Sequence, residues 1–523
     1  MAAAKYSIVD LSPINRLLEK TVCRQCGGDM SIQKSTHEYG VAVQLCLECS
    51  VCGDVVREWS SQRLPGSAKC NPFQVNILAA RAALTTGNGQ TALNDFFSTM
   101  GISHRGLHNK TYQAHLKSKL KPAATLAAES VLTDCASSVK ELYRELNFGN
   151  PGNIAVCFDG TWMTRGHQSH IGVGSVIELF SGYVLDYVVL CNYCLGCKNA
   201  PKEEDPQYNA WKAQHVCQKN TDSKSGQMEV DAALMLFQRS LERHGLRYTT
   251  MLFDGDSKHF RAVEEAKVYG FIPVEKEDCT NHVQKRMGSA LRNLLQKHKA
   301  EDCERLSGKG RLTADLITKL SNYYGWALKS NAGDVEQMHR AVMATYYHVT
   351  STDKRPNHGL CPQGTNSWCK QNAAIARGQQ PPKHRYNLPD YVSQALLPVY
   401  KRLAHKDLLS RCQRGQTQNA NEALHSVIWS LMPKTKHASL ISVEVAVTEA
   451  VMRFNSGTQE AASRILQELQ VEQNHIASQR AQEKDSRRAI GSERKRAASA
   501  CFISAAKRRH QRKTDEHYSP GAF

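Results

Sequence analysis

The sequence lacks long apolar segments. No uninterrupted apolar run approaches the ~20 residues that a membrane-spanning helix needs. The N-terminus, MAAAKYSIVDLSPINRLLEK, has Asp10 and Pro13 where a secretory signal would carry its apolar core. No heptad repeat marks a coiled coil. We therefore expect neither secretion nor insertion into a membrane. Without a heptad repeat, the sequence does not indicate where copies of the chain would contact one another.

Acidic residues are scarce relative to basic ones. The 523 residues include 67 Lys and Arg against 49 Asp and Glu, a formal net charge of +18. That much positive charge in a mostly globular chain favours a polyanionic partner, first of all nucleic acid, with an anionic membrane surface as the weaker alternative. The hydrophobic content of 41% can bury a large core, and the length suggests about three domains.

The eighteen cysteines would suggest disulfides in a secreted protein, but many stand in Cys-x-x-Cys pairs, which in a reducing compartment more often bind zinc. Residues 21–60 hold two such pairs, each followed by a glycine that lets the backbone turn around a metal. The spacing predicts a zinc ribbon that either touches DNA or docks on the protein body. Its ligands would be Cys23, Cys26, Cys49 and Cys52. Free buried cysteines are the alternative, and we expect Cys46 to be one.

A second group of metal-ligand residues lies in an insertion at residues 191–220. Three thiolates and an imidazole make a closed tetrahedral zinc site, which would clamp a long loop with few apolar residues. These ligands would be Cys194, Cys197, His215 and Cys217, with Cys191 as a spare ligand and unligated thiols as the alternative. A similar cluster further along shows only three candidate ligands and stays unassigned: His358, Cys361 and Cys369.

The middle of the chain changes its hydrophobic period. After helical patterns over residues 73–146, short apolar runs and helical spacings alternate. The patterns predict strands at 153–159, 170–180, 183–190, 248–253 and 271–275, and helices at 228–245 and 257–270. The resulting order, β-β-β-α-β-α-β, is the ribonuclease H-like arrangement, an α/β fold with a mixed sheet. A long helical region then follows from about residue 283 to 409.

The basic residues concentrate at the C-terminal end. From 480 to 513, twelve Lys and Arg less three acidic residues leave +9, half of the total charge. Such a run is usually a solvated arm that can bind DNA or serve as a nuclear import signal. The expected organisation is a zinc ribbon at 21–60, a helical module at 70–147 that is a candidate for DNA binding, core residues 150–285, an all-α insertion at 286–410, the last core part at 411–475 and a basic disordered tail at 476–523.

Acidic residues follow two of the predicted core strands. Asp159 ends the first strand and Asp254 ends the fourth, and this order of elements places those strands side by side. Adjacent carboxylates repel each other unless a cation lies between them, and hard oxygen ligands favour Mg²⁺ or Mn²⁺. A third acid, Glu422, lies in the first turn of a predicted helix and would help to hold a second ion. Asp256 competes with Asp254, and a lone strand-end aspartate is more often a turn or helix-cap residue.

Four segments carry a resemblance to a known family. CFDGTWMTRGH, LFDGDSKHF, DCTNHVQKRMG and GQTQNANEALHSVIW resemble the Mutator-like transposase domain of animal DNA transposons, within the wider Mutator and hAT group of D-D-E transposases. The resemblance covers nearly the whole chain from Cys23. It implies a nuclear, homo-oligomeric enzyme that binds transposon ends and target DNA. With two Mg²⁺ or Mn²⁺ ions, it would cleave a phosphodiester and transfer the freed 3′ end.

The resemblance also implies roles for single residues. Asp159, Asp254 and Glu422 would be the catalytic metal ligands, and Cys279 and His282 would form a structural or DNA-positioning pair. We expect Trp368 to be a core residue. The alternative is that it stacks on a flipped base, as an inserted tryptophan does in related transposases. Further candidates for phosphate contacts are Arg165, His167 and Lys258, which surface salt bridges would explain equally well. The alternatives are a catalytically inactive DNA-binding protein and a nuclease without strand transfer.

Overall fold

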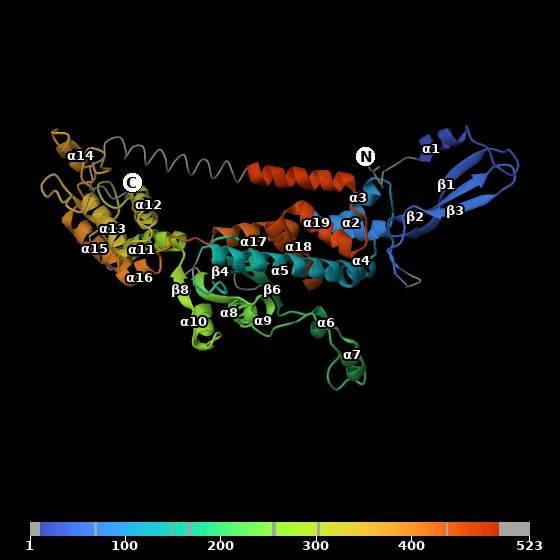
Figure 1. The fold of residues 1–523 in the computed structure, drawn as a ribbon, viewed down its shortest axis with the longest axis horizontal. Helices are drawn as coiled ribbons and strands as arrows, with labels where there is room; N and C mark the ends of the chain where they lie inside the picture. The colour runs from blue at the N-terminus through green and yellow to red at the C-terminus, as the bar shows by residue number, and fades with distance from the viewer. Residues whose placement is uncertain are drawn as a thin grey trace.

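The chain folds into an elongated molecule with a small sheet at one end, a larger sheet in the middle and a group of helices at the other end (Figure 1). The computed structural model describes residues 11–66, 71–146, 149–164, 169–253, 258–300, 304–435 and 438–490. Within these residues, no helix combines the length and the apolar character that crossing a membrane requires.

The small sheet belongs to the N-terminal part of the chain. Helix α1 (Leu11–Leu18) precedes three antiparallel strands, β1 (Met30–Tyr39), β2 (Ala42–Cys49) and β3 (Val55–Trp59), in the order β1-β2-β3. Strands β1 and β2 lie in the segment that separates the two cysteine pairs. Only the two ends of β2 are buried, so the sheet has little hydrophobic core of its own.

The larger sheet has five strands in the order β6-β5-β4-β7-β8. The chain forms them as β4 (Asn153–Trp162), β5 (Ile171–Glu178), β6 (Val184–Cys191), β7 (Arg247–Phe253) and β8 (Glu275–Asp278). Central strand β4 is antiparallel to β5 and parallel to β7. The first and fourth strands are therefore neighbours, as the sequence predicted. The connections between the parallel strands contain helices. A tight turn reverses the chain direction and would make the next strand antiparallel.

Helices cover both faces of this sheet. On one face α8 (Ser225–Gln238) packs on β4, β5 and β6, followed along the chain by α9 (Ser240–His244) and α10 (Lys258–Glu265). On the other face lie α5 (Lys121–Glu145), α17 (Asn419–Leu431) and α18 (Leu440–Ser456). Neighbouring residues of β5 face opposite sides of the sheet. Gly174 faces α8, where an added Cβ would meet Ala232, and Ser175 faces α17, where it contacts Asn421.

The helices before the sheet share its hydrophobic core. They are α2 (Gln74–Thr85), α3 (Gln90–Thr99), α4 (Asn109–His115) and a short π-helix (Leu116–Leu120) that leads into α5, and α19 (Thr458–Glu468) packs on α5 as well. One continuous set of buried side chains joins these helices to the sheet and to α17–α19. Loop helices α6 (Leu195–Lys198) and α7 (Tyr208–Gln214) follow β6 and project away from it (Figure 1).

A second hydrophobic core lies in the helices between β8 and α17, which we call the helical lobe. Its elements are α11 (Thr280–Ala300), α12 (Ala314–Ser330), α13 (Val335–Thr350), α14 (Lys370–Ala376), α15 (Asp390–Leu403) and α16 (Lys406–Ser410). Leu320, Val342 and Tyr400 are fully buried among them. Because α11 begins directly after β8, the lobe is attached at the edge of the sheet.

Three strand and tail predictions need correction. Strand β4 does not end at Asp159 but pairs with β5 as far as Trp162. The fifth strand lies at Glu275–Asp278 rather than 271–275. Its side chains are all charged, and Glu277 and Asp278 pair with Arg414 and Arg411 of the segment before α17. Hydrophobic patterning cannot show such a strand, because ion pairs rather than apolar side chains hold it.

The predicted disordered tail begins too early. Residues 475–490 form a helix, in which Ala481 is buried and Asp485 accepts hydrogen bonds from the backbone nitrogens of Thr458 and Gln459 at the start of α19. Capping of an N-terminus by a carboxylate stabilises both partners. Residues 491–523, which hold most of the basic run, lie outside the described residues.

Candidate active site and metal centres

Asp159 lies two residues beyond the last described pair between β4 and β7, in which Cys157 is opposite Leu252. At Val156 and Cys157, strand β4 pairs with β5 on one side and with β7 on the other. From Phe158 to Trp162, the described residues show β4 paired with β5. The Asp159 side chain is about a quarter exposed, and its Oδ1 accepts a hydrogen bond of 2.9 Å from the backbone nitrogen of Gly160.

Helix α17 and the residue before it pack along this half of β4. Gln418 Nε2 donates a 3.2 Å hydrogen bond to the carbonyl oxygen of Phe158, and Trp429 Nε1 donates a 2.8 Å bond to Thr161 Oγ1. Between them, His425 Nδ1 lies 3.8 Å from Asp159 Oδ2. The start of α17 and one of its faces therefore lie along β4 between Phe158 and Thr161. On another face of the helix, Leu424, Ile428 and Leu431 are buried in the core.

The imidazole beside Asp159 is uncharged near neutral pH. Burial, with a smaller contribution from Lys434, lowers the pKa of His425 to about 4. Burial in a low-dielectric environment disfavours the charged form of a histidine. His425 therefore places a neutral polar group, and no positive charge, next to the carboxylate.

Glu422 occupies the first turn of α17, as predicted, and is exposed. It follows Gln418 by four residues and precedes His425 by three, so these side chains share one helix face. Lys258, at the start of α10, is exposed. The other residues predicted for this region, Asp254, Asp256, Arg165 and His167, lie outside the described residues. Strand β7 ends at Phe253, directly before Asp254 in the sequence.

Cys279 joins three elements near the same end of the sheet. It is buried between Cys157 of β4 and Leu252 of β7. Its backbone nitrogen donates to the Phe253 carbonyl oxygen, and its sulfur accepts a 3.4 Å hydrogen bond from the backbone nitrogen of Gln418. Burial raises the pKa of this thiol, but hydrogen bonds from His282 and Gln418 outweigh it and lower the pKa overall. The pair at Cys279 and His282 thus connects β7, α11 and the start of α17.

An open hollow lined mainly by polar and basic side chains extends from this point over the helical lobe. It has a volume of about 820 Å³ and lies between α11, α15 and α16. Its polar lining includes His282, Lys285, Arg286, Arg402, His405 and Arg411. Two of these arginines also pair with the buried carboxylate of Asp278, which fixes them at the base of the hollow.

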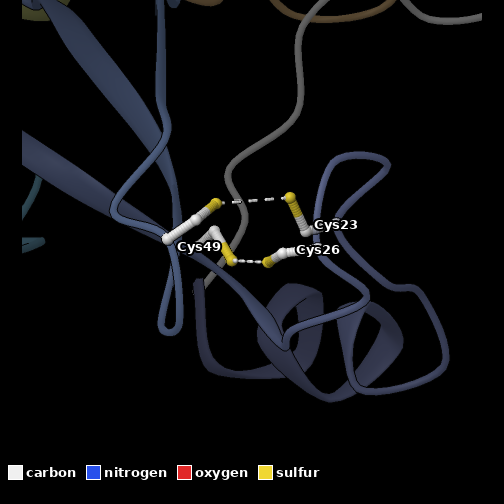
Figure 2. Close-up of side chains that lie close together, drawn as sticks. Cys23, Cys26 and Cys49 are labelled. Atoms are coloured by element: carbon white, nitrogen blue, oxygen red, sulfur yellow. Dashed lines mark hydrogen bonds between the residues drawn. The ribbon is translucent and has the colours of Figure 1, made fainter.

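The first predicted zinc site is assembled. The ligand atoms of Cys23, Cys26, Cys49 and Cys52 all lie within 4.8 Å of one another, with 3.7 Å between the sulfurs of Cys23 and Cys52 and 3.5 Å between those of Cys26 and Cys49 (Figure 2). A tetrahedral zinc with Zn–S bonds of about 2.3 Å has sulfurs about 3.8 Å apart. Gly27 and Gly53 have positive φ angles of 74° and 68°, so both glycines make the predicted turns. The cluster could hold a zinc ion.

The second predicted site is assembled as well. His215 Nε2 lies 3.5 Å from the sulfur of Cys194 and 3.2 Å from that of Cys197, and the sulfurs of Cys197 and Cys217 are 3.4 Å apart. The ring of Trp211 stacks on the imidazole at 4.6 Å between centroids, which fixes its orientation. The spare ligand Cys191 is buried outside the cluster, where its thiol donates to the Tyr193 carbonyl. Half-buried Cys46 also stands outside both clusters.

Trp368 is not a residue of a helix core. It lies in the loop between α13 and α14, is half-buried, and meets the ring of His348 edge-on at 4.9 Å. It lines a cavity of about 560 Å³ together with Lys370, Lys383 and Arg385. The expectation that it is a plain core side chain is therefore wrong, because the side chain is half-buried and lines this cavity.

Sequence reasoning missed the residues that join α17 to β4. Gln418, His425 and Trp429 lie against Phe158, Asp159 and Thr161 of the strand, respectively. Their spacing of seven and four residues places them on the helix face that carries Glu422. This pattern is visible in the sequence. Thr161 has no such signal, since its partner lies more than 250 residues away.

Comparison with known proteins gives one match. The family described as Mutator-like transposase matches residues 6–369, more than half of the chain. No curated protein and no solved structure matches it. The matched region includes the first cysteine cluster, the strand with Asp159, the insertion with the second cluster and the pair at Cys279 and His282. The chain therefore belongs to the Mutator-like transposase family.

Proposed function

We propose that the chain is a D-D-E transposase with a ribonuclease H-like core, which cleaves DNA at transposon ends and joins the freed 3′ ends to target DNA. The observation that carries this proposal is the position of Asp159. It stands on the central strand, two residues beyond the last described pair with the parallel neighbour β7, and next to His425 of α17. Membership of the Mutator-like transposase family supports the same function.

Asp254 is the proposed second metal ligand. The parallel pairing joins Ala155 to Thr250 and Cys157 to Leu252. Asp159 and Asp254 each stand two residues beyond that last pair in the sequence, and the carboxyl ends of parallel strands form one crevice. Asp256 is the alternative for this role.

Glu422 is the proposed third ligand. It shares a helix face with His425, whose ring lies beside Asp159, and residues three apart on a helix are neighbours. Its exposed position in the first turn of α17 leaves the carboxylate accessible to an ion and to DNA.

The donor set fits two Mg²⁺ or Mn²⁺ ions, because the three proposed ligands are carboxylates and these hard cations prefer oxygen. The uncharged ring of His425 beside Asp159 leaves the negative charge of that carboxylate for a cation. When bound, a pair of such ions supplies activation of the attacking oxygen and stabilisation of the leaving 3′ oxygen in a phosphoryl transfer. The chain itself positions Asp159 through the contacts of α17 with β4.

The basic hollow over α11, α15 and α16 is the proposed path for DNA beyond the active site. Its lysine and arginine side chains can contact phosphates without reading the sequence. Cys279 and His282 would hold the start of this path against the sheet. We assign phosphate contacts to Arg165, His167 and Lys258, and nuclear import and further DNA contacts to the basic tail. Action on two DNA ends favours a homo-oligomer in the nucleus.

The two predicted clusters are proposed structural zinc sites. The distances between their ligand atoms are close to those around tetrahedral zinc. Cys194→Ser should lower the zinc content of the chain by one ion, measured by elemental analysis. Cys135→Ser is the control, since Cys135 is buried on α5 outside both clusters. An unchanged content in Cys194→Ser would contradict the second site.

One assay tests the enzymatic proposal. The full chain is incubated with DNA carrying the transposon terminal repeats, a target plasmid and Mg²⁺ or Mn²⁺. We expect cleaved ends and joined products from the unmodified chain. Binding without cleavage would support an inactive DNA-binding protein, and cleavage without joining would support a nuclease.

The site assignment is tested in the same assay. Asp159→Asn should retain DNA binding and lose cleavage, because it removes a charged metal ligand and keeps the shape of the side chain. Asp315→Asn, an exposed residue on α12, is the matched control and should cleave normally. Full activity in Asp159→Asn would show that another group holds the metal.

A further inference from the structure

A third cluster of metal-ligand side chains lies inside the helical lobe. His348 stands in the last turn of α13, His358 and Cys361 in the loop that follows, and Cys369 directly before α14. Their ligand atoms all lie within 4.8 Å of one another. The sequence shows only the last three as a group, since His348 lies ten residues earlier on a helix. The fold supplies the missing fourth ligand.

We propose that His348, His358, Cys361 and Cys369 form a structural zinc site, a third one in this chain. Two thiolates and two imidazoles are a complete ligand set for a closed tetrahedral zinc. The site is independent of the proposed active site and of the transposase function. It adds one ion to the two expected from the clusters that the sequence predicts.

The distances between the ligand atoms match zinc coordination. With Zn–S bonds of about 2.3 Å and Zn–N bonds of about 2.0–2.1 Å, sulfur and nitrogen stand about 3.6 Å apart in a tetrahedron. The sulfur of Cys361 lies 3.7 Å from Nδ1 of both His348 and His358, and that of Cys369 lies 3.4 Å from Nδ1 of His358. Both imidazoles thus present the same nitrogen toward the sulfurs.

The surroundings of His358 provide an independent observation. Its Nε2 lies 2.9 Å from Nε2 of His384, and Nδ1 of His384 lies 2.8 Å from Oδ1 of Asp353. If Nδ1 of His384 donates to Asp353, its Nε2 accepts a hydrogen bond from Nε2 of His358. The proton of the neutral His358 ring is then on Nε2, and its lone pair is on Nδ1, the atom that faces the sulfurs. A metal-bound histidine characteristically donates its other N–H to a further polar group, which fixes its tautomer and orientation.

Burial also suits a closed site. Cys361 is 1% exposed and Cys369 is fully buried, whereas the two histidines are half-buried. A closed structural site leaves no coordination position for water or substrate. The loop around it, residues 351–389, contains one short helix and few buried apolar side chains. A metal clamp that ties this loop to α13 would replace the hydrophobic core that it lacks.

The proposed zinc site would also fix part of the wall of the cavity beside the cluster. Trp368 contacts His348, and Lys370 follows Cys369, so the ligands hold part of the lining of the cavity. Zinc at this cluster would keep Trp368, Lys370 and Lys383 in one arrangement. Its removal should loosen residues 351–389 and leave α12 and α15, which have their own buried contacts, unchanged.

Elemental analysis of the full chain, purified with zinc and without chelator, tests the proposal. We expect three zinc ions per chain in the unmodified protein and two in Cys361→Ser and in Cys369→Ser. Cys412→Ser is the matched control, because Cys412 is equally buried in the same lobe but stands outside the cluster. A zinc content that neither cysteine variant lowers relative to the unmodified chain would overturn the proposal.

A second measurement keeps the proposal testable should the cysteine variants fail to fold. Asp353→Asn leaves all four ligands in place and removes only the charged group at the end of the histidine chain. In a competition with a zinc chelator, one of the three ions should be released about 10–100-fold more readily than from the unmodified protein. Equal release from both proteins would contradict the assignment. A disulfide between Cys361 and Cys369, found by mass spectrometry in protein purified with a reducing agent, would contradict it as well.

Discussion

The imidazole Nδ1 of His425 lies 3.8 Å from the carboxylate Oδ2 of Asp159, across the contact between α17 and β4. These residues are far apart in the sequence, yet they meet two residues beyond the last described pair between β4 and β7. Because burial lowers the pKa of His425 to about 4, the histidine places an uncharged polar ring beside the carboxylate. We predict that His425 is a positioning residue for the proposed metal ligand.

His425→Ala should weaken metal-dependent DNA cleavage about 10–100-fold, the usual effect of losing a group that supports a metal ligand. We expect DNA binding to be unchanged and the Mn²⁺ concentration for half-maximal cleavage to rise. His425→Asn, which restores a polar group of similar reach, should recover part of the activity. The control is His475→Ala, an exposed residue of the C-terminal helix. An unchanged Mn²⁺ dependence in His425→Ala would rule out the positioning role.

The hydrogen bond between Trp429 Nε1 and Thr161 Oγ1 should stabilise the attachment of α17 to the sheet. Trp429→Phe keeps most of the ring and removes the donor, and should lower the free energy of unfolding by about 1 kcal/mol. Thr161→Val should cost about 1–3 kcal/mol, since it leaves the indole N–H without its acceptor. Urea denaturation of both single variants and the double variant measures the coupling between the residues. Strictly additive losses would mean that the two side chains do not interact.

Stability should fall on acidification because of His244. This side chain is buried near Asp186, and burial outweighs that carboxylate and lowers the pKa of His244 to about 4. The unfolded chain, with a histidine pKa near 6.5, binds the proton first, so stability is complete above pH 6.5 and is lost as the pH falls toward 4. Between pH 7.5 and 5 the loss due to His244 should be about 2 kcal/mol.

His244→Gln should remove this part of the pH dependence. The measurement is the free energy of unfolding in urea at pH 7.5 and pH 5 for both proteins, which differ in this one titrating group. The difference between their pH dependences isolates His244 from the carboxylates that also titrate. Parallel pH dependences for the two proteins would contradict the burial of a neutral imidazole.

Chelation of zinc should affect the small N-terminal sheet before the large one. Strands β1–β3 bury few side chains, and zinc binding supplies folding free energy to such modules. Hydrogen exchange after chelator treatment should show loss of protection at residues 30–59, while β4–β7 keep theirs through the continuous core around the sheet. Cys49→Ser should reproduce the effect without chelator. Protection that survives both treatments would mean that the small sheet is stable without metal.

The sequence by itself determined the features that depend on neighbours along the chain. Short apolar runs predicted the strands β4, β5, β6 and β7 in order, because a strand buried on both faces carries apolar side chains almost throughout, whereas apolar residues of a helix recur every three to four positions. The Cys-x-x-Cys spacing predicted two metal clusters, because a turn of a few residues brings both sulfurs to one ion. Four short motifs predicted membership of the Mutator-like transposase family, which the family match over residues 6–369 confirms.

Only the tertiary structure decided which distant residues meet. It joined His348 to His358, Cys361 and Cys369, placed His425 beside Asp159, and made a strand from the charged segment Glu275–Asp278 through ion pairs with Arg411 and Arg414. None of these leaves a short-range pattern, since each depends on the packing of helices that the sequence separates. Local spacing encodes turns and periods, whereas the contacts that complete the sites arise when the sheet, α17 and α13 take their places in the fold.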